Sequence, residues 1–442
     1  MVKNYSLAKD GISVFGTQML TLIIGFVSGV LLARWLGPAG RGAFTALLVY
    51  PTILISLLSM GMRQATVYYL GKKKYSESDI IGVTLLLLIS SSIIGVLTSV
   101  AIIAYTKNPD YNLILILLAS LTIPTDLTIN YFTGILIGKQ KINKFNKVMY
   151  LVPIINFVLI TFLVFFIKLY ILGAVLATLI AKIVLAIYAL LSINREYSLK
   201  ICWKPEIIKK MVSIGSVYAL SLFILNLNYR VDIIILEHLS NVAEIGQYTI
   251  GVGFAELLWQ LPAAFGLVIF AYSANAKDSN KFSQDIAKMV RIIFPVVLFG
   301  SVFLYFASGY IIPFLYGEEY IPSIKMLKIL LPGIVMMSFF KIINMDLAGR
   351  GKPDITIKLF LPAVLINIVL NIILIPDFGG CGAAFASTVS YTLASISILY
   401  YYLRITQLSL RELFICNKND FDFLLNVILK IIKGKNVSSK SN

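Results

Sequence analysis

The sequence is poor in histidine, cysteine and charged residues. Its 442 residues include one histidine, His238, and three cysteines, Cys202, Cys381 and Cys416. A single histidine excludes zinc binding through several histidines and does not indicate Ser/His catalysis. The cysteines have no paired spacing, so neither a disulfide framework nor a cysteine metal site is indicated. We therefore expect no catalytic residues, no metal and no cofactor.

Charged residues make up only 13% of the chain and hydrophobic residues 59%, with a mean hydropathy of +0.88. A soluble domain of this composition would expose very large apolar patches, so the sequence predicts a polytopic membrane protein. The net charge of +17 would also suit a nucleic-acid partner. The basic residues, however, lie in short loops between apolar runs, where they act as topology signals, and we expect no nucleic acid to bind.

Apolar runs of membrane-spanning length recur along the chain. A helix needs about 20 residues to cross a hydrocarbon core about 30 Å thick. The first run is too long for a cleavable signal and leads into further membrane sequence. We predict an all-α protein with about twelve transmembrane helices, at residues 11–33, 43–70, 80–104, 113–137, 148–167, 172–193, 212–236, 245–270, 286–307, 323–345, 357–375 and 380–403.

The loops alternate in basic charge. With both termini inside, the inner regions hold 28 Lys and Arg residues and the outer regions hold 6, and the remaining four lie within the predicted helices. This count assigns five residues near helix ends to the adjoining loops, namely Lys288, Arg291, Lys325, Lys328 and Lys358. This bias predicts a multi-pass protein of a prokaryotic cytoplasmic (inner) membrane with both termini cytoplasmic.

Residues 194–211 form a basic segment between the sixth and seventh predicted helices. We interpret it as a cytoplasmic linker between an N-terminal six-helix lobe, residues 1–193, and a C-terminal six-helix lobe, residues 212–403. Residues 404–442 are predicted to be a cytoplasmic tail. Polar residues at helical spacing between apolar ones indicate an interfacial amphipathic helix there, with Asp422, Asn426, Lys430 and Lys433 on its polar positions.

The two halves contain an internal repeat. Three residues have counterparts exactly 211 positions later, namely Gly138 and Gly349, Lys147 and Lys358, and Asn156 and Asn367. Six predicted helices separate the counterparts, and an even number preserves the direction of crossing. The repeat therefore predicts two pseudo-symmetric lobes, parallel to each other, around a central cavity.

Three stretches resemble a known family. They are LARWLGPAGRG at residues 32–42, YRVDIIIL at residues 229–236 followed by EIGQY, and GRGK at residues 349–352. The chain is similar, over about its first 405 residues, to the Wzx-like polysaccharide flippases of the multidrug/oligosaccharidyl-lipid/polysaccharide (MOP) exporter superfamily. The lipid II flippase branch has arginines within its first helix. Here that helix has no basic residue before Arg34.

The resemblance implies a MATE-like MOP fold and a flippase, not an enzyme. Such a protein would move a polyprenyl-pyrophosphate-linked oligosaccharide from the inner to the outer leaflet for surface polysaccharide biosynthesis, by alternating access of two lobes. Its partners would be that glycan lipid and membrane lipids. H⁺ or Na⁺ and polysaccharide assembly enzymes remain open as further partners.

Two alternatives remain open. A cation-coupled drug or metabolite exporter of the same superfamily would have an acidic cavity. A membrane glycosyltransferase or polysaccharide polymerase would have a sizeable outer loop with clustered carboxylates or basic motifs. The longest predicted outer loop, residues 308–322, offers only Glu318 and Glu319.

Apart from the residues near helix ends that are counted with the loops, seven ionisable residues fall inside predicted helices, where each charge costs roughly 2.5–3.5 kcal/mol to insert. The basic ones are candidates for binding the substrate's phosphates, since guanidinium groups suit bidentate phosphate contact. The acidic ones are candidates for ion coupling or charge balance. Structural ion pairs, such as Lys182 with Asp126, are the alternative. The basic set is Arg63, Lys182, Arg230 and Lys341, and the acidic set is Asp126, Asp232 and Glu256.

Two positional points qualify this set. Arg230 and Asp232 are two residues apart, so their side chains diverge around a helix and need not pair. Arg34 and Arg41 flank the glycines of the first outer turn. A tight connection explains those glycines without a ligand. The alternative for the two arginines is contact with the phosphate of a departing substrate.

Overall fold

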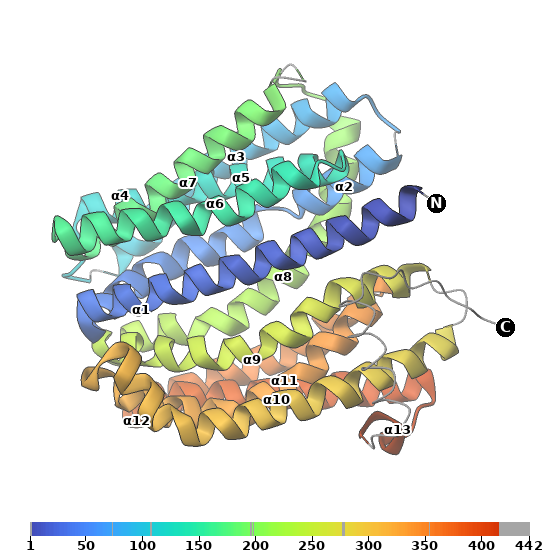
Figure 1. The fold of residues 1–442 in the computed structure, drawn as a ribbon. Coiled ribbons are helices and arrows are strands. Elements are labelled where there is room, and N and C mark those ends of the chain that lie inside the picture. The colour runs from blue at the N-terminus through green and yellow to red at the C-terminus, as the bar shows by residue number, and fades with distance from the viewer. Residues whose placement is uncertain are drawn as a thin grey trace. The chain divides into compact units, whose positions relative to one another are not determined.

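The protein is helical throughout the part that the computed structural model describes, which is residues 2–72, 74–106, 108–194, 197, 199–275, 279–352 and 354–414, and no strand occurs there. The all-α fold class is confirmed. In chain order (Figure 1) the elements are α1 (Val2–Leu58), α2 (Met62–Lys72), α3 (Glu77–Tyr105), α4 (Leu113–Ser120), α5 (Thr122–Gly138), α6 (Ile142–Ile160), the π-helix η1 (Thr161–Phe166), α7 (Tyr170–Asn194), α8 (Pro205–Leu239), α9 (Val242–Asn275), α10 (Ser279–Tyr316), the 3₁₀-helix η2 (Glu318–Tyr320), α11 (Pro322–Gly349), α12 (Asp354–Thr406) and α13 (Leu410–Phe414).

Nine helical stretches within the described residues are long and apolar enough to cross a membrane. The count of twelve crossings stays a prediction. The two longest helices, α1 and α12, are each bent at a glycine with positive φ, 65° at Gly37 and 51° at Gly379. Residues 11–33 and 43–70 are therefore joined at a kink within one helical run, at the position where the sequence predicts a tight outer turn. Glycine makes this possible because it lacks the Cβ that disfavours positive φ.

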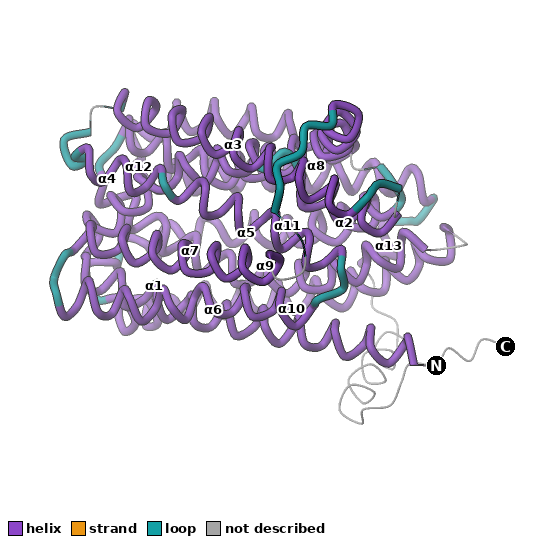
Figure 2. The backbone as a smooth tube through the Cα atoms, turned by 90° about the horizontal axis from the view of Figure 1, so that it is seen from above, coloured by secondary structure: helices purple, strands orange, loops and turns teal. Residues whose placement is uncertain are grey.

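Helix ends follow local sequence signals. Ser76 and Asn112 cap α3 and α4 by accepting backbone N–H groups of Asp79 and Leu115 at 3.1 and 2.8 Å, as N-cap residues do. Met60 and Gly61 have φ values of 48° and 59° and interrupt the single helix predicted over residues 43–70. The connections between helices are short (Figure 2).

Several expected boundaries differ. The predicted outer loop at residues 308–322 is largely helical, because α10 continues to Tyr316 and η2 follows at once. The end of the predicted linker is helical too, since α8 begins at Pro205, a residue favoured in the first helical turn. The amphipathic helix predicted at residues 422–433 lies outside the described residues.

The chain forms two compact units. Unit 1 comprises the described residues up to Gly251 together with Gly309–Met326 and Val364–Ser387, and unit 2 comprises Val252–Ser308, Leu327–Ala363 and the described residues from Thr388 on. These units do not follow the predicted lobes, which stay a prediction. Each unit has an aromatic interior: Tyr131 and Phe132 are buried in unit 1, and Phe339 and Phe360 in unit 2.

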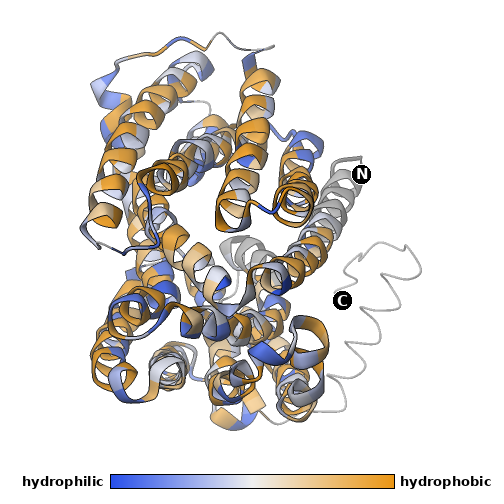
Figure 3. Cartoon of the chain, turned by 90° about the vertical axis from the view of Figure 1, so that its left-hand side faces the viewer, coloured by the Kyte–Doolittle hydropathy of each residue, from blue (hydrophilic) through white to orange (hydrophobic). Residues whose placement is uncertain are grey.

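The outward helix faces are apolar. On α3, for example, Ile93 and Leu97 are 57% and 66% exposed. Figure 3 shows hydrophobic residues along the helices and hydrophilic residues in the loops. Large exposed side chains of this kind suit contact with lipid, which agrees with a multi-pass membrane protein.

The internal repeat is visible in the backbone. Gly138 is the last residue of α5 and its counterpart Gly349 is the last residue of α11. Two residues further on, Gln140 and Gly351 both have positive φ, 57° and 75°. The repeat in sequence therefore coincides with the same helix end and the same reversal of backbone conformation.

Candidate functional site

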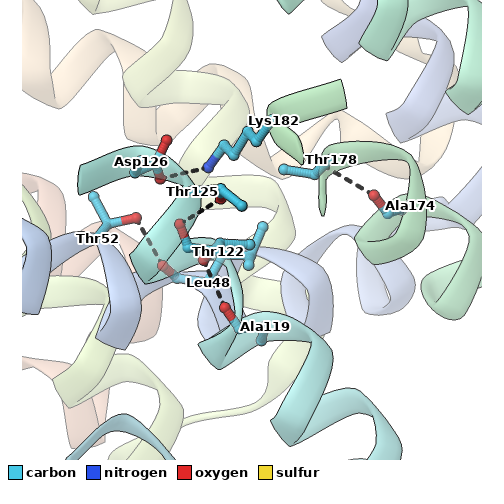
Figure 4. A network of polar contacts seen from close by, with 9 residues as sticks. All are labelled: Leu48, Thr52, Ala119, Thr122, Thr125, Asp126, Ala174, Thr178 and Lys182. Carbon is cyan, nitrogen blue, oxygen red and sulfur yellow. Dashed lines mark hydrogen bonds and ion pairs between the residues drawn. The ribbon is translucent and has the colours of Figure 1, made fainter. Parts of the chain in front are cut away.

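A charged pair lies between the apolar helices α5 and α7 of unit 1. Nζ of Lys182 donates to Oδ2 of Asp126 at 2.7 Å (Figure 4). The two side chains are 22% and 27% exposed, so packing does not seal them from their surroundings. The structure thus contains the ion pair that the sequence analysis named as the structural alternative.

Threonines surround this pair on three helices. Thr52 on α1 donates to the Leu48 carbonyl at 2.8 Å, and Thr178 on α7 donates to the Ala174 carbonyl at 2.9 Å. Thr125, next to Asp126, donates to the Thr122 carbonyl in the same way. Figure 4 places these hydroxyls around the ion pair. Their protons are engaged, but each oxygen keeps lone pairs that can accept from water or a sugar hydroxyl.

Arg63 lies on α2, against α5. Its guanidinium is 5.5 Å from the ring centroid of Phe145, a cation–π contact. The backbone there is tightly packed, because a Cβ added to Gly134 of α5 would lie 2.9 Å from Cα of Arg63. The position of Arg63 is thus fixed by a glycine that sequence spacing alone does not reveal.

Asp232 is 1% exposed and is held by hydroxyl groups. It accepts hydrogen bonds from the hydroxyl of Tyr248 on α9 and from Oγ of Ser387 on α12, the latter at 3.2 Å. The Ile233 N–H adds a third bond at 2.8 Å. Arg230, two residues away on α8, is within electrostatic range both of Asp232 and of Arg41 on α1.

In unit 2, Lys341 lies over an aromatic ring. Its Nζ is 4.2 Å from the ring centroid of Trp259, and Glu256 on the same helix as Trp259 interacts electrostatically with it. Trp259 is 5% exposed and its ring centroid is 6.0 Å from that of Tyr391. The indole is thus packed between a cation and a second ring, a structural role.

Asp346 is a buried carboxylate that the sequence analysis missed. It is 0% exposed and pairs with Arg350 at 2.8 Å, while the hydroxyls of Tyr402 and Ser273 donate to it at 2.7 Å each. We had ended that helix at residue 345, whereas α11 continues to Gly349. The i,i+4 spacing of Asp346 and Arg350 was the available signal.

The fold defines the class of protein. An inward-facing multidrug resistance transporter of the MATE family and MOP superfamily matches with a TM-score of 0.70 at 16% identity, covering 87% of this chain and 95% of that one. The lipid II flippase MurJ, in an inward closed conformation, matches with a TM-score of 0.69 at 19% identity over 96% of each chain. The protein has the MOP-superfamily fold of membrane transporters.

The sequence then places the chain within that class. The model of the family described as polysaccharide biosynthesis protein matches residues 7–273, so the chain belongs to this family. A curated relative, the putative O-antigen transporter of Shigella flexneri, is 24% identical over 427 residues, covering 90% of this chain and 98% of the relative. Its name and those of the structural neighbours are names of transporters and flippases, not of enzymes, in agreement with the sequence analysis.

Proposed function

We propose that the protein is a flippase that moves a polyprenyl-pyrophosphate-linked oligosaccharide from the inner to the outer leaflet for surface polysaccharide biosynthesis. Three comparisons support this proposal: the family membership, the transporter name of the Shigella relative, and the fold shared with a lipid II flippase. The residue-level support is the partly exposed ion pair of Lys182 and Asp126.

That ion pair carries the proposal because of where it lies. α5 and α7 are both within apolar stretches of membrane-spanning length. Within such a stretch, a charged side chain with a fifth to a quarter of its surface exposed would cost free energy if that surface faced lipid. Charged residues of transporter helices instead face the protein interior or a water-filled space. A polar head can cross such a space while its lipid tail stays in the bilayer.

The pair leaves capacity for a phosphate. A lysine ammonium has three N–H donors, and Asp126 takes one of them. The remaining donors of Lys182 can bind phosphate oxygen, and the surrounding threonine oxygens can accept from sugar hydroxyls. Arg63, Arg230 and Lys341 complete the set of basic residues that we propose for substrate contact.

Transport would proceed by alternating access of the two six-helix lobes. Asp126, Asp232 and Glu256 are our candidates for coupling to H⁺ or Na⁺ or for charge balance. Asp126 has its charge balanced by Lys182, and Asp232 has three hydrogen-bond donors. Glu256 interacts electrostatically with Lys341, so all three acids have neighbouring groups that act on their charge.

A cation-coupled exporter is the alternative, since a MATE transporter has the same fold. An exporter of organic cations needs an acidic group available to its substrate. Asp126 is already bound by a lysine at 2.7 Å, which favours the flippase.

The test is native mass spectrometry of the protein purified gently from its own host. We expect the unaltered chain to carry a polyprenyl-pyrophosphate glycan, and the double variant Lys182→Ala, Arg230→Ala to lose it. The matched control, Lys168→Ala with Lys325→Ala, removes two positive charges at exposed positions and should keep the lipid. An unaltered protein that carries no such lipid but binds organic cations, with loss in Asp126→Asn or Glu256→Gln, would establish the exporter instead.

A further inference from the structure

A cavity of about 330 Å³ lies beside the start of α12. This volume is within the range of small-molecule sites, about 300–1,000 Å³. The residues that line the cavity all belong to unit 2, and none of the four basic residues proposed for substrate contact is among them. They are Lys352, Asp354, Ile355, Lys358, Leu359 and Tyr401. The cavity is therefore a separate feature of the fold.

The two arms of α12 meet at this cavity. The helix bends at Gly379, so the residues before and after the bend form two arms. Ser390 on the second arm donates to the carbonyl of Ala363 on the first arm at 3.0 Å. Asp354 in the first turn and Tyr401 near the end of the helix consequently line the same space. The cavity is thus built by one helical hairpin and by the lysine that precedes it.

The rim of the cavity is charged and its interior is apolar. Lys352 and Lys358 are exposed, whereas Ile355 is only 7% exposed. Asp354 also lies at the rim and pairs with Lys358 at 3.0 Å, with side chains 55% and 74% exposed. An ion pair this exposed contributes little to stability. The ammonium group of Lys358 can therefore exchange the carboxylate for a phosphate.

The internal repeat shows what distinguishes this end of the second copy. Lys352 has its counterpart in Lys141, 211 positions earlier, and the same offset makes Lys144 the counterpart of Ile355. In the first copy, Nζ of Lys144 donates to the carbonyl of Ser192 on α7 at 3.4 Å. An isoleucine cannot make this contact. The second copy therefore has an apolar residue where the first has a lysine bound to the neighbouring helix, and the cavity lies beside that residue.

The second arm of α12 has an exposed apolar face next to the cavity. Leu393, Ile396 and Tyr400 are 38%, 51% and 57% exposed, and their spacing of three and four residues places them on one side of the helix. Arg404 extends that side and is exposed, with its guanidinium 4.6 Å from the ring centroid of Tyr400. An apolar length of helix thus ends in a tyrosine and a cation, as is common at a membrane interface.

We propose that this cavity binds the phosphate headgroup of an anionic phospholipid from the inner leaflet, whose acyl chains lie against the apolar face that ends at Arg404. Lys352, Lys358 and Arg404 supply three positive charges against the one negative charge of Asp354. Basic pockets beside transmembrane helices bind lipid headgroups in this way. The bias of basic residues predicts that this end of α12 faces the inner leaflet. The proposal requires a multi-pass membrane protein and does not depend on what the protein transports.

The test is native mass spectrometry of the full chain, stripped of lipid in detergent and titrated with phosphatidylglycerol, phosphatidylcholine or glycerol phosphate. We expect phosphatidylglycerol to bind about tenfold or more tightly than phosphatidylcholine, because its headgroup has a net negative charge. Glycerol phosphate has the charge but no acyl chains. It should bind about a hundredfold more weakly than phosphatidylglycerol, since it gains nothing from the apolar face.

Two variants test the charge and the shape of the cavity separately. Lys352→Gln with Lys358→Gln should lower the affinity for phosphatidylglycerol about tenfold or more and remove the preference over phosphatidylcholine. Leu359→Trp leaves the charge unchanged and should also lower the affinity, because the larger side chain fills the cavity. The matched control, Lys288→Gln with Arg411→Gln, removes two positive charges elsewhere in unit 2 and should change the affinity less than twofold.

Three results would overturn the proposal. Equal binding of the two phospholipids would show that the site does not select an anionic headgroup. Binding of glycerol phosphate as tight as that of phosphatidylglycerol would indicate a site for a soluble anion. Equal losses in the cavity double variant and its control would indicate attraction to the whole basic surface. Thermal unfolding without lipid checks that each variant folds. If Leu359→Trp unfolds at a lower temperature, the two double variants decide alone, because the cavity lysines are exposed.

Discussion

Lys182 and Asp126, which are 56 residues apart in sequence, are joined at 2.7 Å between α7 and α5. The pair connects the two helices and places charge within an apolar part of the chain. The structural role and the proposed substrate role of the pair predict different responses to substitution.

A double-mutant cycle separates these roles. Lys182→Gln and Asp126→Asn should each destabilise the protein by about 2 kcal/mol, because each leaves one partly buried charge without its partner. The double variant should recover most of that loss, since no charge remains. Thermal unfolding in nanodiscs measures stability. Losses that simply add in the double variant would contradict the pairing.

Retention of the co-purifying glycan lipid in the same three variants tests whether the pair contacts the substrate. If Lys182 contacts phosphate, the double variant regains stability without regaining the co-purifying glycan lipid. Recovery of both would assign the pair to structure alone.

The close approach of Gly42 and Gly246 predicts that Gly246→Ala separates α1 from α9, since its Cβ would meet the Pro38 carbonyl at 2.0 Å. Spin labels at two exposed residues, Ala39 on α1 and Asn241 directly before α9, should move apart in pulsed electron spin resonance. Gly29→Ala is the matched control on α1, because no atom lies within 4 Å of its added Cβ. An unchanged distance distribution in Gly246→Ala would contradict the backbone contact.

Asp346→Asn should destabilise unit 2 by about 3–5 kcal/mol, because Arg350 would keep a largely buried charge without its partner. Lys358→Gln offers a comparison of the same i,i+4 type: its pair with Asp354 has side chains 74% and 55% exposed. That change should cost less than about 0.5 kcal/mol. Thermal unfolding in detergent compares the two, and equal shifts would refute the difference in burial.

The bias of basic residues, 28 inside against 6 outside, predicts the sidedness of the loops. In a chain whose cysteines are replaced by serine, Lys325→Cys should react with a membrane-impermeant maleimide on intact cells. Lys200→Cys should react only after permeabilisation. Both positions are exposed, so accessibility does not limit either reaction. The opposite labelling pattern would invert the topology.

Sequence predicted the fold class because long apolar runs have few structural solutions in lipid. It also named Lys182 with Asp126 as a potential pair, which the structure contains. These inferences depend on the spacing of nearby residues and on the free-energy cost of a charge inside the membrane. A single sequence is enough to assess both.

The sequence did not predict the contacts in which the backbones of two distant segments touch each other. The approach of Gly42 to Val242 involves residues 200 positions apart, and nothing local to either marks it. Asp346 was missed for a simpler reason, since a helix end misplaced by a few residues removed it from the membrane set.

The matched backbone reversal at Gln140 and Gly351 bears on the ancestry of the chain. An L-residue such as glutamine pays about 1 kcal/mol for a left-handed conformation that glycine adopts freely. The first copy has this conformation at Gln140, where it is unfavourable, and the second copy has it at Gly351, where it is not. The two copies therefore share the backbone conformation without sharing the residue, as expected if one ancestral segment was duplicated and each copy then changed in sequence while the course of the backbone was kept.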